Sequence, residues 1–295
     1  MSKTDKMIIA SGKKKNSAAN TAMTVFVYVV CILIAILCIF PFWAMIVNAT
    51  RSSAEIQQRA VALIPSSNLM QNYKVLQKYE SSGFRPLIGF KNSMIISTLA
   101  TVCSVYFSTL TAYAIVVYDW KLKRAFFSFV MAVMMVPGQI VVVGFYQMIF
   151  KVHLNNTFLP FIIPAIAAPS MVFFMKQYME PSLSLEIVQS ARIDGAKEFF
   201  TFNMIALPIM KPAIATQAIF SFVSNWNQLF LPLILLKGDK RTMPVMVSLL
   251  KGDIYRTEYG SIYLGLTLTV LPLFIVYFAL SKYIIAGVAL GSVKG

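Results

Sequence analysis

The chain has 295 residues, of which 58% are hydrophobic and only 13% are charged. Soluble domains of this length do not need so much apolar surface, and long apolar runs indicate a membrane protein. The formal net charge of +15 is spread over loops and tails. This excludes a nucleic-acid-binding protein, which would carry a basic face on a soluble domain. It favours contact with anionic lipid headgroups instead.

The apolar runs predict an all-α, polytopic membrane protein. A bilayer core requires about 20 apolar residues per helix. Runs that meet this requirement give about six transmembrane helices, at roughly 22–47, 92–118, 125–150, 157–175, 213–236 and 261–281. The expected organisation is a tail over 1–21, a transmembrane domain over 22–284 and a second tail over 285–295.

Basic residues near the first span predict its orientation. The first 20 residues carry five lysines, and the apolar run that follows has no small-residue cleavage pattern, so we expect a retained first span. The positive-inside rule then places the N-terminal tail in the cytoplasm, and the basic loop 119–124 agrees. The short basic C-terminal end is also expected in the cytoplasm.

Two polar segments are expected on the opposite side of the membrane. Residues 51–90 form the longer one, with a helix near 69–76. Residues 237–260 mix acidic and basic side chains, which predicts a solvated loop that could meet an extracytoplasmic partner.

The ionisable and metal-binding residues argue against chemistry within this chain. Cys31, Cys38 and Cys103 fall in predicted spans as small core residues, and the single His153 has no second ligand, so no metal site and no cofactor are expected. The six span cores contain no Asp, Glu, Lys or Arg, whereas ion-coupled carriers usually keep such groups at membrane depth. The sequence also lacks a phosphate-binding G-x-x-x-x-G-K-[ST] loop, so a transporter of this kind needs a separate ATPase.

Uncharged polar residues within the spans are candidates for a translocation path. They are Gln139, Asn225, Trp226, Asn227 and Gln228. Buried amides can simply join helices, which is the commoner role. Alternatively they line a hydrated path where Pro137-Gly138 and Pro232 interrupt the helices and free backbone groups.

The stretch 180–212 is the longest polar interruption in the second half of the chain. A helix is expected from Pro181 to Ala191, with Ile187, Ser190, Ala191 and Asp194 on one face. Asp194-Gly195 predicts a bend, because glycine tolerates backbone angles that other residues avoid. A second short helix is expected from Ala196, before Pro208 and Pro212.

The letters S-A-R-I-D-G-A at 190–196, followed by I-A-L-P at 205–208, closely resemble the cytoplasmic EAA loop of ATP-binding-cassette importer permeases of the carbohydrate type. In that family the loop is a coupling helix that docks on the ATPase. The resemblance implies a coupling loop over about 180–204, with these ATPase-coupling residues: Glu186, Gln189, Ser190, Ala191, Arg192, Asp194, Gly195 and Ala196. Gln189 departs from the pattern, since the family usually has a glutamate there.

The resemblance implies a permease subunit of an ATP-driven importer for a sugar, with an oligosaccharide as the expected cargo, in a bacterial inner membrane. Its implied partners are a homologous second permease, two ATPase subunits and an extracytoplasmic sugar-binding protein, and it is not an enzyme. Two alternatives remain open. A stand-alone carrier or channel would transport without ATP, and a membrane enzyme would need clustered acidic or histidine side chains.

Overall fold

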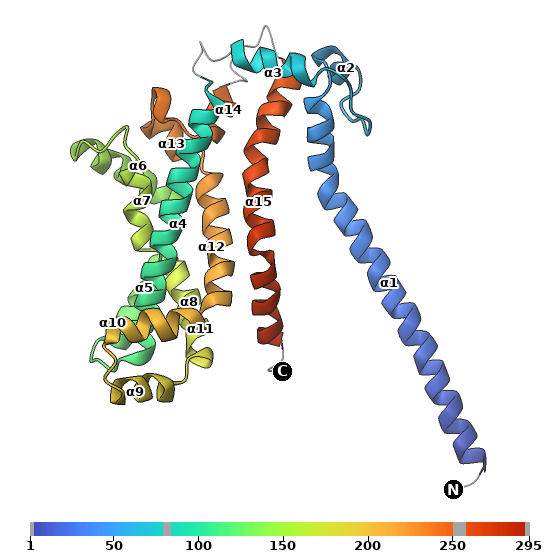
Figure 1. Cartoon of the computed structure of the whole chain (residues 1–295), viewed down its shortest axis with the longest axis vertical. Coiled ribbons are helices and arrows are strands. Elements are labelled where there is room, and N and C mark those ends of the chain that lie inside the picture. Colours follow the sequence, from blue (N-terminus) through green and yellow to red (C-terminus); the bar gives the residue numbers. More distant parts are fainter. Residues whose placement is uncertain (1–2, 79–83, 250–257, 293–295) are drawn as a thin grey trace. The chain divides into compact units, whose positions relative to one another are not determined.

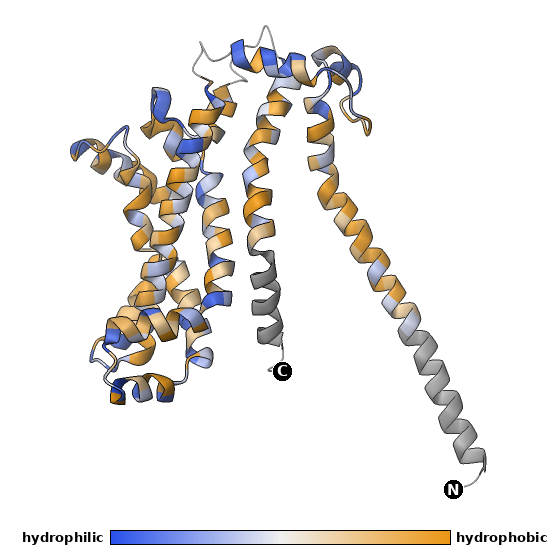
Figure 2. Cartoon of the chain, in the orientation of Figure 1, coloured by the Kyte–Doolittle hydropathy of each residue, from blue (hydrophilic) through white to orange (hydrophobic). Residues whose placement is uncertain are grey.

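The computed structural model describes residues 3–78, 84–249 and 258–292, with side chains described over 21–78, 84–138, 140–249 and 258–279. The chain divides into two compact units, residues 1–73 with 258–267, and residues 74–257 with 268–295. Each unit is built from helices, which confirms the predicted all-α class. Apolar residues run along the long helices and hydrophilic residues gather near helix ends and in the connecting segments (Figure 2).

The first unit contains α1 (Lys3–Ala49), α2 (Ser53–Gln58) and the beginnings of α3 (Leu69–Lys78) and α15 (Tyr259–Ser292). Within α1, Thr21–Ala49 is long and apolar enough to cross a membrane, with a mean hydropathy of 3.0. This segment confirms the expected span at 22–47. The helix expected near 69–76 is α3.

Hydrogen bonds around Glu55 hold the segment after α1 in place. Ser52 caps α2, and its backbone N–H donates to the Glu55 carboxylate at 2.6 Å. That bond, with the hydroxyl groups of Ser52 and Ser66, holds the pKa of Glu55 below its ordinary value. The Asn72 amide donates to the carbonyl oxygens of Ala49 and Arg51 at 2.8 and 2.9 Å. This part of the expected outer segment is therefore ordered.

The second unit is organised around α4 (Pro86–Val117). Helices α8 (Pro169–Ser182) and α12 (Lys211–Trp226) pack against α4, and α5 (Lys123–Met134) packs against α8 (Figure 1). Small side chains on α4 allow this packing, because Ser97, Ala100 and Ser108 are fully buried.

Two of the expected spans are interrupted. Residues 125–150 form α5 and α6 (Gly138–Lys151) rather than one helix, and Pro137, which has no N–H to donate, precedes α6. Residues 213–236 form α12 and α13 (Phe230–Leu235), separated by 227–229. Pro232 lies in the first turn of α13, so the expectation that it breaks this span is wrong by a few residues.

Within the described residues, four helices are long and apolar enough to cross a membrane, and a strongly bent pair raises the number to five. The other three besides the α1 segment are Pro86–Val117, Leu159–Ser182 and Tyr259–Ala279. Leu159–Ser182 comprises α7 (Leu159–Ile162), η2 (Pro164–Ile166) and α8. The chain therefore crosses the membrane several times, although the six expected spans are not six continuous helices.

Of the described residues in the expected solvated loop at 237–260, those before α14 are largely solvated. Arg85 pairs with Asp239 at 2.8 Å beside the short turn η4 (Gly238–Lys240). Helix α14 (Met243–Leu249) then buries apolar side chains against α4, and its Met243 N–H donates to Ser93 Oγ at 2.9 Å. Residues 250–257 lie outside the described part of the chain.

Gly260 gives a prediction about the first unit. A Cβ at this position would overlap the carbonyl oxygen of Arg51 and the amide of Asn72, so the backbone must shift. Gly260→Ala is therefore expected to cost about 1–3 kcal/mol and to lower the Tm of the detergent-solubilised protein.

Gly144→Ala is the matched control for Gly260→Ala. It lies within α6, and a Cβ there has no neighbour within 4 Å. Because alanine favours helix over glycine by about 0.5–1 kcal/mol, the control Tm should stay level or rise. Equal melting temperatures for the two variants would contradict the close approach at Gly260.

Candidate functional site

The polar stretch after α8 forms a sharp elbow, which we define as residues 184–201. Its first helix is α9 (Leu185–Ile193), with Ser184 as N-cap, whose hydroxyl accepts from the Glu186 N–H at 3.3 Å. Pro181 belongs to the last turn of α8, so the expected helix start at Pro181 is wrong. The physical reason is that Ser184 provides the capping oxygen that an N-terminus needs.

The predicted bend at Asp194-Gly195 is confirmed. Gly195 has φ +81°, a conformation that side chains disfavour. The Ala196 N–H donates to the Ala191 carbonyl at 2.9 Å and the Gly195 N–H donates to the Arg192 carbonyl at 3.0 Å, which closes the end of α9. The second helix, α10 (Glu198–Thr201), begins two residues later than expected.

Beyond α10 the chain continues through the π-helical turn η3 (Phe202–Ala206) and α11 (Leu207–Ile209). The segment 198–209 makes an angle of 80° with α12. The chain turns at Met210, between Pro208 and Pro212, in agreement with the expected punctuation.

The two sides of α9 differ in exposure. Val188 and Ala191 are 1% and 8% exposed, whereas Ile187 is 45% exposed and Ser190 and Asp194 are also exposed. The expected common face is therefore divided. Ala191 lies on the side that the chain itself covers.

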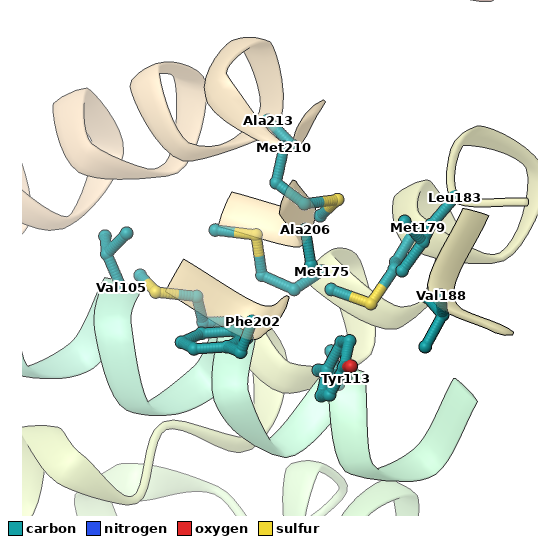
Figure 3. Packing of buried hydrophobic residues seen from close by; sticks show 12 residues of the cluster. Val105, Tyr113, Met175, Met179, Leu183, Val188, Phe202, Ala206, Met210 and Ala213 are labelled. Atoms are coloured by element: carbon teal, nitrogen blue, oxygen red, sulfur yellow. The ribbon is translucent and has the colours of Figure 1, made fainter. Parts of the chain in front are cut away.

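A methionine-rich core joins α9 to the transmembrane helices. Val188 belongs to one buried cluster with residues of α4, α8, η3 and α12, and Figure 3 shows these side chains converging around the sulfur atoms. Met175, Met179 and Met210 are fully buried in it. Phe202 packs against Tyr113, with ring centroids 5.4 Å apart. Val188 therefore places α9 in the same buried cluster as residues of α4, α8 and α12.

Glu198 fastens the elbow to the end of α4. Its carboxylate accepts from Arg192 Nε at 2.6 Å, from the Tyr118 hydroxyl at 2.6 Å and from the Tyr113 hydroxyl at 3.4 Å. Arg192 also lies over the Tyr118 ring, 5.5 Å from its centroid. The bonds from Arg192 and Tyr118 hold the pKa of Glu198 below its ordinary value. The hydrogen bond to the Glu198 carboxylate also raises the pKa of Arg192.

Most of the predicted coupling residues are available to a partner. Glu186, Gln189, Ser190, Asp194 and Gly195 are exposed, Ala196 is half-buried, and Arg192 is exposed but paired with Glu198. The sequence did not single out Glu198 as a coupling residue, whereas in the structure its carboxylate links Arg192 to Tyr118. The sequence did not single out Ile193 and Phe199 either, which are 86% and 71% exposed at the bend.

The predicted path residues separate into two kinds. Trp226 is 1% exposed, donates from Nε1 to the Thr269 carbonyl at 2.9 Å and stacks on Phe222. Its ring is therefore part of the packing. Asn225 donates to the Ser221 carbonyl within its own helix, and Asn227 is exposed.

Gln228 lies at a cavity of about 720 Å³ between α6 and α13. Its described lining residues are Gly138, Val142, Val143, Tyr146, Gln228, Phe230, Leu231 and Ile234, none of which is charged. The cavity thus adjoins both helix interruptions. Gln139 lies in the first turn of α6, and its side chain is outside the described residues.

Comparison with known proteins identifies the family. Residues 104–289, which include the elbow and its core, match the family described as binding-protein-dependent transport system inner membrane component. The chain belongs to this family. It is therefore a multi-pass membrane component of an importer and not an enzyme, since ATP hydrolysis in this family belongs to a separate subunit.

Individual relatives agree with this family. The chain is 34% identical to the arabinooligosaccharides transport system permease protein AraQ of Halalkalibacterium halodurans, over 89% of this chain and 93% of the relative. It is 30% identical to the lactose transport system permease protein LacG of Rhizobium radiobacter, over 90% of this chain and 95% of the relative. A crystal structure of a bacterial transporter that imports the acidic polysaccharide alginate shares the fold, with TM-score 0.75, 20% identity, and coverage of 90% of this chain and 97% of that chain.

The link through Glu198 gives a testable prediction. Glu198→Gln preserves size but removes the charge that Arg192 and Tyr118 stabilise. The Glu198 side chain is 43% exposed, so water screens part of the interaction. We therefore expect the substitution to lower the free energy of opening α9 by about 1 kcal/mol. This corresponds to about a fivefold faster hydrogen exchange at the α9 amides. Glu180→Gln is the control, since among the described residues Glu180 pairs with Lys176 of the same helix, at 2.6 Å.

The same link predicts a dependence on pH. A carboxylate whose pKa is depressed by folding stabilises the folded form above its ordinary pKa of 4.5 and loses this contribution as the pH falls through the lowered value. Wild type should therefore exceed Glu198→Gln in Tm at pH 6–8, and the difference should shrink below about pH 4.5. A difference that grows on acidification would contradict the link.

Proposed function

We propose that this chain is the sugar-translocating permease subunit of an ATP-driven importer and that its cargo is a neutral oligosaccharide. The relatives named above include permeases of arabinooligosaccharide and lactose transport systems. The uncharged lining of the cavity between α6 and α13 supports a neutral cargo over an anionic one.

The proposal that this chain couples to an ATPase subunit rests on the elbow. Its covered side is packed into the methionine-rich core, while its bend presents Ile193, Phe199 and Phe200 to solvent at 86%, 71% and 54% exposure. Exposed apolar side chains next to a rigid attachment favour docking of a partner protein. We infer that an ATPase subunit binds here, so that its closure pushes α9 and, through the core, moves α4, α8 and α12.

The proposed assembly contains this chain, a homologous second permease, two ATPase subunits and an extracytoplasmic sugar-binding protein. The elbow lies in the cytoplasm in this arrangement, as do both termini. Motion between discrete arrangements of the packed helices then exposes the cavity alternately to the two sides of the membrane.

Uptake into vesicles tests the proposal. The chain, copurified with its partner subunits and reconstituted with the binding protein, should accumulate a labelled neutral oligosaccharide only when ATP is supplied to the ATPase side. Oligo-arabinoside and lactose are the neutral probes and oligo-alginate is the anionic one. Uptake without ATP would instead establish the stand-alone carrier, and preferential uptake of alginate would refute a neutral cargo.

Ile193→Asp tests the docking surface. A charge at the most exposed apolar residue of the bend should weaken docking without disturbing the core, because Ile193 is 86% exposed. Since loss of a central interface residue costs about 2–4 kcal/mol, we expect uptake to fall at least about tenfold. Membrane insertion should be unchanged, and Ile193→Val is the control. Normal uptake by Ile193→Asp would argue against docking at this bend.

A further inference from the structure

The turn between α4 and α5 concentrates positive charge. Lys121, Lys123 and Arg124 line a hollow of about 650 Å³ together with Trp120 and a single acidic residue, Asp119. Lys121, Arg124 and Trp120 are exposed, and Lys123 is half-buried. The hollow therefore has three cationic side chains against one carboxylate, and it favours an anion.

The position of these cations is unfavourable for the chain alone. Lys123 and Arg124 are the first two residues of α5, which has no acidic residue in its first turn and no side-chain cap. The N-terminus of a helix carries a partial positive charge that repels cations. Among the described residues, this repulsion is relieved for Lys123 alone, which donates to the Tyr118 carbonyl at 3.1 Å. An anion at the turn would relieve the remaining repulsion.

An apolar stripe leads from the same turn along α5. Leu122, Phe126, Phe129 and Val133 follow one another at helical spacing and are 67%, 37%, 64% and 38% exposed. An adjacent side of α5 packs Val130 against Ile115 and Val172. Trp120 lies against Phe126, with ring centroids 5.7 Å apart, and so joins the hollow to the stripe.

The length of the stripe fits one lipid leaflet. Helix α5 has 12 residues, or about 18 Å at 1.5 Å per residue. Half of a bilayer's hydrocarbon core is about 15 Å thick. Tryptophan beside lysine and arginine is typical of the level where headgroups begin. A cationic hollow above an apolar stripe of this length matches the two parts of a phospholipid.

We propose that the α4–α5 turn and the outer side of α5 bind one anionic phospholipid. Its phosphate occupies the hollow between Lys121, Lys123 and Arg124, and an acyl chain lies along Phe126 and Phe129. An acidic protein segment would satisfy the cations but leave the stripe uncovered, and a purely apolar partner would leave the cations unpaired. The lipid satisfies both, and its binding is independent of which sugar is transported.

Native mass spectrometry of the intact importer tests the proposal. The complex is titrated with dioleoyl-phosphatidylglycerol and, separately, with dioleoyl-phosphatidylcholine. We expect at least about tenfold preference for the anionic lipid at one site. The variant Lys121→Gln/Lys123→Gln/Arg124→Gln should lose that preference, and Phe129→Ala should weaken binding of the lipid severalfold.

The matched control removes the same charge elsewhere. Lys74, Lys91 and Lys151 are exposed, and replacing all three with glutamine should leave the tight phosphatidylglycerol site intact. Unchanged binding in the first triple variant would overturn the proposal. So would inorganic phosphate binding as tightly as the lipid, because the stripe would then have no role. Loss of ATPase subunits from the first triple variant, with lipid binding retained, would assign the turn to a protein contact instead.

Discussion

A packed apolar core holds the short polar helix α9 against the ends of the longer helices. Helix α9 has one covered side, Val188 and Ala191, and it is held from a second direction by Glu198, which joins Arg192 to Tyr118. Apolar packing covers one side of α9, and the directional bonds to Glu198 tie the elbow to Tyr118 at the end of α4. The elbow is thus attached to α4 by two kinds of contact.

The features that were predictable from the sequence are those fixed by neighbouring residues. Hydropathy located the long apolar helices, and the chemistry of glycine located the bend at Gly195. The start of α9 was misplaced because Pro181 suits the first turn of a helix, yet here it lies in the last turn of α8. The role of Glu198 was not predictable, since its partner Tyr118 lies 80 residues earlier and nothing local reports that contact.

The helix interruptions show how a membrane protein without charged span cores can still present polar groups. Both 135–137 and 227–229 end helices near the cavity between α6 and α13. Helix ends leave backbone groups without intrahelical partners, and such groups are tolerated at membrane depth only in contact with protein or water. The backbone N–H and C=O groups at these ends offer hydrogen-bonding partners beside an otherwise uncharged cavity.

The thioether side chains beneath the elbow also bear on how this protein has diverged. Met171, Met175, Met179 and Met210 share one buried cluster, and methionine is unbranched and fills irregular gaps by rotating about several bonds. A drifting sequence at the elbow can thus be accommodated by repacking without loss of contact. The fold itself is shared with a transporter chain only 20% identical in sequence, so it does not require one particular set of core side chains.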